Sequence, residues 1–301
     1  MWALLKSLAT QTIAKWSDEP GPRFAAALAF YTALTIVPLV VLTIMVSVSM
    51  VGDESMVGGL QRQIGELIGE SAANGLFRII AQWRSAGSPL VNGVVALGVF
   101  VIGALKVMDQ LRDALDCIWG LQPKHPPRMG DRLKRRFASL SGLFGIAFIL
   151  LASLTLSAWT GIAIQLVLET TGMPGRLVQG IGLLMSFGVV STLFAMIYKW
   201  VPQAQVAWSD VWVGAGITAI LYLLGSKLLV VYLAHNTLVA FYGAAGSLVL
   251  VLLWAYYASQ VFLFGAAFIA VYATHHGSQV KPTEETVVVH VASQGESETE
   301  G

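Results

Sequence analysis

Charged residues are scarce in this chain of 301 residues: Asp, Glu, Lys and Arg together make up 12% of it, whereas they make up about a quarter of a soluble domain. Hydrophobic residues reach 56%, and the mean hydropathy is +0.71. This composition excludes an ordinary soluble domain. The net charge of +1 also gives no indication of a nucleic-acid partner, because proteins that hold phosphates concentrate uncompensated Lys and Arg.

Cysteine is nearly absent as well, since Cys117 is the only one in the sequence. A single cysteine excludes an intramolecular disulfide, a CxxC pair and a zinc site built from cysteines.

Long apolar stretches make up most of the chain, and a helix needs about 20 such residues to cross a bilayer core. The stretch from Tyr242 to Tyr272 contains no Asp, Glu, Lys, Arg or His. Its small residues gather at both ends, where they let neighbouring helices approach closely, so we expect the other spans to pack around it. The sequence predicts an all-α fold, a polytopic transmembrane bundle over residues 23–274 with six spans at about 24–51, 89–107, 137–167, 177–200, 211–234 and 243–273.

Four further segments lie outside these spans. Residues 1–22 place apolar side chains at helical spacing and predict an N-terminal interfacial amphipathic helix. Residues 53–88 predict an extracytoplasmic amphipathic insertion, which is compatible with lying on the membrane surface, capping the bundle or acting as a lid over a cavity. Residues 120–136 form a basic cytoplasmic loop. Residues 275–301 are rich in Ser, Thr, Glu and Gln and predict a disordered acidic cytoplasmic tail.

The basic loop carries six Lys or Arg residues against one Asp between positions 124 and 136. By the positive-inside rule this loop is cytoplasmic, so six spans place both termini in the cytoplasm. Such a cluster also attracts anionic lipid headgroups, by about 1 kcal/mol per basic residue. An RNA-binding patch is the alternative, but aromatic residues for base stacking are missing apart from Phe137. The predicted headgroup-binding residues are Lys124, Arg128, Arg132, Lys134, Arg135 and Arg136.

Lys227 is the one charged residue well inside a predicted span. An ionisable group within the membrane is a candidate functional residue, because it must face a cavity or a partner. Counted from Asp210 at about 1.5 Å per residue, Lys227 lies most of the way across the membrane, where its side chain can snorkel to the outer interface. A lysine that faces a cavity and a lysine that snorkels both stay open. The other polar side chains predicted to line a cavity or act in function are Tyr31, Tyr242, Gln260 and Asp113.

Pro38 lies in the middle of the first predicted span. A proline there removes one backbone hydrogen bond and kinks the helix, and a neighbouring helix or a Ser or Thr hydroxyl has to compensate. Thr35 is placed to help. Pro38 is therefore a candidate hinge, and a static kink that serves packing is the alternative.

Asp109, Asp113 and Asp116 stand at i, i+4 and i+7, so they share a helical face. Because hard cations bind several oxygens, this face is a candidate metal site. The favoured interpretation is a segment that emerges into water, since Lys106 and Arg112 lie within one turn and no His or fourth carboxylate is spaced to complete the site. We predict no metal site, no catalytic residue and no cofactor.

Two stretches carry more specific residues. The last span contains Tyr-Gly-Ala-Ala-Gly-Ser at 242–247, Leu-Trp with a following Tyr at 253–256, and Phe-Gly-Ala at 264–266. The first span contains Ala-Ala at 25–26, Ala-Phe-Tyr at 29–31, and then Thr35 and Pro38. Both stretches resemble the YihY/virulence factor BrkB family, which has also carried the name ribonuclease BN.

The resemblance covers about 24–273 and implies a six-span protein of the bacterial inner membrane without secure catalytic residues. One position departs from the family pattern. The family usually has Gly-Ala-Glu where this chain has Gly265, Ala266 and Ala267, which puts a mechanism through that carboxylate, such as proton coupling, in doubt.

We favour a transporter or lipid-handling protein of the cell envelope, because small-residue helix contacts, the kinked first span, Lys227 and the basic loop all fit it. A non-catalytic scaffold for envelope or virulence partners is the alternative. A membrane-bound ribonuclease ranks last, because it needs clustered carboxylates or His, and we therefore do not predict an enzyme. Expected partners are the bilayer, its anionic headgroups, and further copies of the chain or other membrane proteins, with no nucleic acid.

Overall fold

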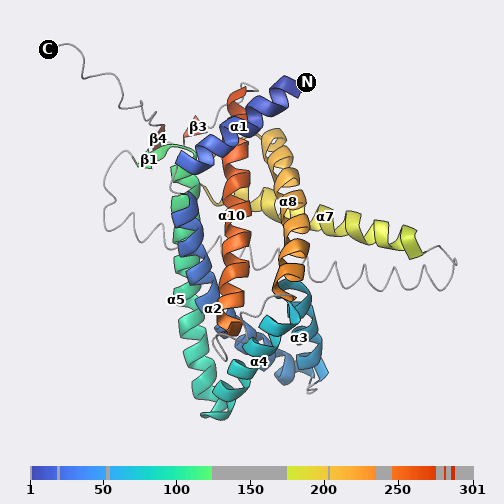
Figure 1. Ribbon diagram of the computed structural model, residues 1–301. Helices are drawn as coiled ribbons and strands as arrows, with labels where there is room; N and C mark the ends of the chain where they lie inside the picture. Colours follow the sequence, from blue (N-terminus) through green and yellow to red (C-terminus); the bar gives the residue numbers. More distant parts are fainter. Residues whose placement is uncertain are drawn as a thin grey trace.

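The computed structural model describes residues 2–18, 21–51, 55–123, 175–202, 204–234, 246–275, 281–282 and 286–288. Its helices are α1 (Trp2–Asp18), α2 (Gly21–Val51), α3 (Ser55–Ile68), α4 (Glu70–Ser85), α5 (Pro89–Ile118), α7 (Gly175–Trp200), α8 (Trp208–Ala234) and α10 (Gly246–His275) (Figure 1). Its strands are β1 (Leu121–Pro123), β2 (Ala204–Gln205), β3 (Lys281–Pro282) and β4 (Thr286–Val288).

Five of the described helices, α2, α5, α7, α8 and α10, are long and apolar enough to cross a membrane. The predicted all-α fold of a polytopic membrane protein is therefore confirmed. The predicted span at 137–167 lies outside the described residues, so the count of six spans stays a prediction.

Helix α10 is the element around which the others are arranged. It packs against α1, α2, α4, α5 and α8, whereas α7 packs mainly on α8 (Figure 1). Ala255, Ala266 and Ala267 of α10 are at most 2% exposed, and such small side chains let neighbouring helices approach closely. The expectation that other spans pack around the last one holds for α2, α5 and α8.

A buried group of polar side chains joins α7, α8 and α10. The Tyr198 hydroxyl donates to the Phe262 carbonyl at 2.7 Å and lies 3.1 Å from Oγ1 of Thr218. Thr218 in turn donates to the Gly214 carbonyl at 2.8 Å. A β-carbon at Gly265 would collide with the Tyr198 and Thr218 hydroxyls, so the three helices can meet this closely only around a glycine.

Helices α3 and α4 cover one end of the bundle (Figure 1). Gly69, with φ of 91°, turns the chain between them, a conformation that glycine adopts without strain. Nε2 of Gln61 donates to Oδ1 of Asn74 at 2.7 Å and ties the two helices together. The apolar face of α4, including Leu76 and Ile80, is buried and packs against α2 and α10. Of the arrangements left open for residues 53–88, these contacts are those of a cap.

The opposite end of the bundle holds the strands (Figure 1). β1 pairs with β4 and β2 pairs with β3, both antiparallel. These strands correct the expectation of a wholly disordered tail, because residues 281–282 and 286–288 are paired. Thr286, Val287 and Val288 are β-branched residues, which favour the extended conformation of a strand.

Helix α1 docks at the same end as the strands. Nε2 of His275 at the end of α10 lies 2.8 Å from Oε1 of Gln11, and the rings of Trp16 and Phe264 meet edge to face at 6.4 Å. Thr12 is fully buried. Part of the face of α1 therefore packs on protein.

Candidate functional site

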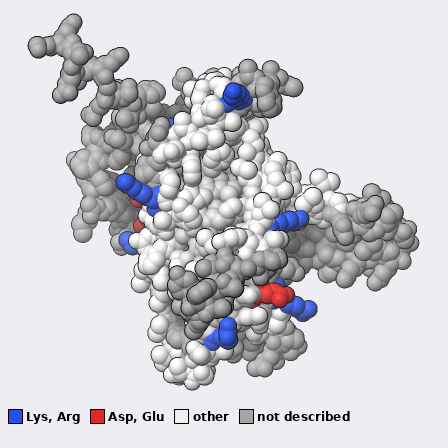
Figure 2. All heavy atoms as spheres, in the orientation of Figure 1, with Lys and Arg blue, Asp and Glu red and all other residues white. Residues whose placement is uncertain are grey.

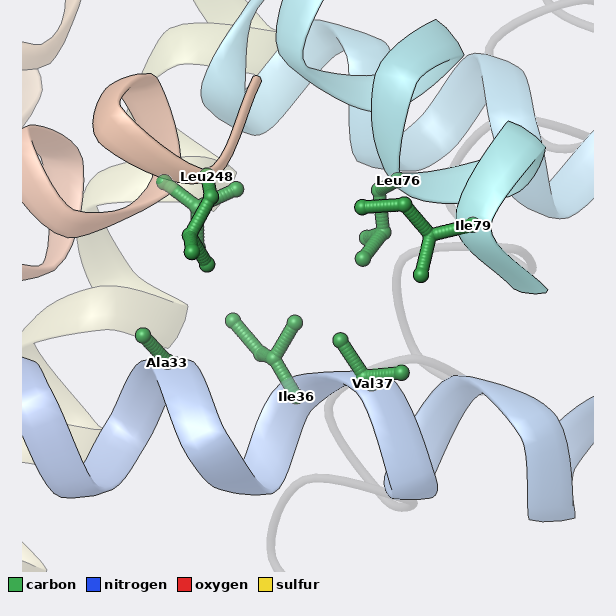
Figure 3. A pocket seen from close by; sticks show the side chains of 7 residues that line it. Ala33, Ile36, Val37, Leu76, Ile79 and Leu248 are labelled. Atoms are coloured by element: carbon green, nitrogen blue, oxygen red, sulfur yellow. The ribbon is translucent and has the colours of Figure 1, made fainter. Parts of the chain in front are cut away.

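A small apolar pocket, which we call the α2–α4–α10 recess, opens where the cap meets the two spans. Helix α2 contributes residues 33, 36 and 37, α4 contributes 76 and 79, and α10 contributes 248 and 251; each set follows the helical spacing that keeps side chains on one face. Every lining side chain is a hydrocarbon. The lining residues are Ala33, Ile36, Val37, Leu76, Ile79, Leu248 and Val251 (Figure 3).

The recess has a buried floor and an exposed mouth. Leu76 and Val251 are 3% and 2% exposed, whereas Ile79 and Leu248 are 38% and 45% exposed. The empty space amounts to about 240 Å³, including the open mouth. Most of this space is open to the surroundings rather than enclosed, so the recess is a shallow apolar groove against which a short segment of a hydrocarbon chain can lie.

Pro38 directly follows the lining residue Val37, and its side chain is buried. Proline has no N–H, so the Leu34 carbonyl loses its helical donor. The expectation that Thr35 compensates is wrong in detail, because its hydroxyl donates to the carbonyl of Tyr31. The reason is geometric, since a Thr hydroxyl in a helix reaches the carbonyl four residues before it. The hinge role of Pro38 stays a prediction.

Lys227 lies on an exposed side of α8, which also presents Leu224 and Leu228 at 61% and 71% exposure. It does not line the recess. This position favours the snorkelling interpretation over a cavity within the described bundle.

The other polar candidates are spread over different helices. Tyr31 on α2 is half-buried, and Asp113 on α5 is exposed. Nε2 of Gln260 donates to the Tyr256 hydroxyl at 2.5 Å within α10, while its Oε1 is buried and has no hydrogen-bond partner among the described residues. None of these three lines the recess. Tyr242 and the headgroup-binding candidates from Lys124 to Arg136 lie outside the described residues.

The acidic face of α5 does not form a compact cluster. Asp109 and Asp113 are exposed and Asp116 is half-buried. Within the part of the chain that the structure describes, no three His, Cys, Asp or Glu side chains gather closely enough to hold a metal ion. Figure 2 shows the few charged side chains scattered over a largely uncharged surface.

Sequence reasoning missed the recess and the group around Tyr198. The spacing of Ala33, Ile36 and Val37 directly before Pro38 was a signal for the recess, but apolar residues at that spacing occur throughout a span. Tyr198 is a polar residue inside a span, and this was the available signal for its buried hydrogen bonds.

The apolar helices, their packing around α10 and their polar contacts define a multi-pass helical membrane protein. The virulence factor BrkB family matches the chain over residues 12–288, and the chain belongs to this family. The name of this family refers to no catalytic activity.

Curated relatives agree with this membership. A UPF0761 membrane protein of Ralstonia nicotianae is 26% identical over 274 residues, which cover 88% of this chain and 58% of the relative. Another, from Verminephrobacter eiseniae, is 28% identical over 250 residues, covering 80% and 56%. A third, from Methylibium petroleiphilum, is 28% identical over 274 residues, covering 90% and 63%. The chain thus spans less than two thirds of the length of these relatives. No solved structure matches it.

Proposed function

We propose that this protein handles membrane lipid by admitting an acyl chain into the α2–α4–α10 recess. The supporting observation is the lining, seven hydrocarbon side chains from two spans and one amphipathic helix. A polar solute would lose its hydrogen bonds to water against such a lining, at about 1–3 kcal/mol per polar group. An acyl chain has no such bonds to lose.

The energetics favour exchange over tight binding. An acyl chain that moves from the bilayer into the recess passes from one hydrocarbon environment to another, since lipid tails are as apolar as leucine. The gain of about 0.8 kcal/mol per CH₂, which applies to leaving water, is therefore largely absent. We expect weak, rapidly exchanging occupancy, which suits a protein that moves lipids.

We further propose that the end of the bundle with the strands faces the bacterial cytoplasm. The basic residues at 124–136 directly follow β1, and basic residues beside spans are retained on the cytoplasmic side. This orientation places the recess near the outer leaflet of the inner membrane.

Replacing Leu248 by Trp tests the proposal. Leu248 is 45% exposed at the mouth, so an indole there fills the recess without entering the buried core. Purified protein is reconstituted into vesicles with a fluorescent phospholipid, and quenching by an impermeant reductant reports movement between leaflets. We expect the parent protein to accelerate this movement and Leu248→Trp to slow it severalfold.

Leu224→Trp is the matched control, because Leu224 is an exposed leucine of α8 at 61% exposure outside the recess. It should keep the parent's rate. Equal rates in both variants would disconnect the recess from lipid movement. If the parent moves no lipid, the scaffold interpretation takes the lead.

A further inference from the structure

The chain after α10 is paired with two loops that lie far apart in the sequence. In one pair, Leu121 lies opposite Val288 and Gln122 opposite Val287. In the other, Gln205 lies opposite Lys281. β3 and β4 lie next to each other, so one C-terminal stretch holds both the chain that leaves α5 and the connection between α7 and α8.

Hydrogen bonds of α5 reinforce the closure at this end. Nε1 of Trp119 donates to the Ala266 carbonyl of α10 at 3.0 Å. Nε of Arg112, a buried residue, donates to the Val201 carbonyl at the end of α7 at 3.3 Å. Gly120, with φ of 68°, then turns the chain from α5 into β1, and this left-handed conformation favours glycine.

The α7–α8 connection is held in place as well. Nζ of Lys199 donates to the Val206 carbonyl at 2.6 Å and lies 5.5 Å from the centre of the Trp208 ring. The strand β2 lies within this connection, so these contacts of Lys199 hold β2 in position to pair with β3.

We infer that β3 and β4 form a strap that holds this end of the bundle closed. Helices α5 and α8 lie on opposite sides of α10 (Figure 1). The strap bridges the two sides, so the strand-bearing ends of α5 and α8 can separate only after β1–β4 or β2–β3 unpairs. The pairs join three residues and two residues. They are short enough to open while the helices stay folded, which makes the strap a conformational switch.

Cysteines at Gln122 and Val287, in a protein with Cys117→Ala, test the register. Directly opposite residues of an antiparallel pair have Cα atoms about 4.5–5.5 Å apart, which a disulfide can bridge. We expect mild oxidation of the full-length protein to link the two peptides, as seen by mass spectrometry with and without reductant. The matched control combines Gln122→Cys with Thr286→Cys. Neighbouring side chains of a strand point to opposite faces, so this pair should link severalfold less. Equal linkage of both pairs would overturn the register.

A second measurement tests whether the strap holds the helices together. Spin labels on cysteines at Asp109 and Ser209, two exposed positions on α5 and α8, report the distance between the two helices in their strand-bearing halves. Prolines at Val287 and Val288 together remove a donor from each edge of β4, because successive N–H groups point in opposite directions. We expect this variant to broaden and lengthen the distance distribution. Alanines at Val287 and Val288 keep both N–H donors and should leave it unchanged. An unchanged distribution in the first variant would overturn the closing role of the strap.

Discussion

Gly265 limits how closely α7, α8 and α10 can approach one another. A β-carbon there would collide with Thr218 and Tyr198, and overpacking of a tight core costs about 1–3 kcal/mol. We expect Gly265→Ala to destabilise the protein by that amount, measured by thermal unfolding in detergent. Gly98→Ala on α5 is the control, since no atom lies within 4 Å of the added carbon. Its stability should equal or exceed the parent's, because alanine is the better helix former. Equal losses in both variants would contradict the packing account.

At the level of single residues, the sequence identified polar groups but could not place them. Lys227 stands out as a charge within a span, yet whether it faces a cavity or lipid depends on the rotation of α8 against its neighbours. Tyr198 carries the polar contacts between three helices. The sequence showed only that Tyr198 is a polar residue inside a span, and this could not reveal its partners, because Thr218 and Gly265 lie on other helices.

At the level of elements, the sequence predicted which spans exist better than it predicted where each helix ends. The second span was predicted at 89–107, whereas α5 continues to Ile118. The charged residues from Lys106 onward ended the predicted span, because hydropathy marks where lipid ends and a helix can continue into water. Helix α2 runs through Pro38, as expected for a proline supported by neighbouring helices.

The sequence did not predict the strands, and the apolar spacing that it showed before Pro38 was too common to predict the recess. The strands β1 to β4 are two or three residues long and pair with partners far away in the sequence. No local sequence pattern therefore indicates that these residues form strands. The recess needs three helices to meet, and only the arrangement of α4 across α2 and α10 creates it.

The whole molecule has two unlike ends, one closed by strands and α1 and the other covered by α3 and α4 (Figure 1). The proposed orientation predicts that single cysteines at Thr10 and Ala86, both exposed, differ in a Cys117→Ala protein. An impermeant thiol reagent added to intact cells should label residue 86, because it lies outside, and should reach residue 10 only after permeabilisation. Labelling of residue 10 in intact cells would reverse the orientation.

The central claim, that an acyl chain enters the recess, is tested most directly by photolabelling. A phospholipid with a photoactivatable group near the end of its acyl chain is crosslinked to the protein in membranes, and the adducts are located by mass spectrometry. We predict adducts at Leu76, which is 3% exposed and is reached through the recess, and their loss in Leu248→Trp. Labelling of the exposed α5 residues Leu90 and Ile102, at 79% and 65% exposure, should be unchanged in that variant. Adducts on α5 with none at Leu76 in the parent protein would contradict the account.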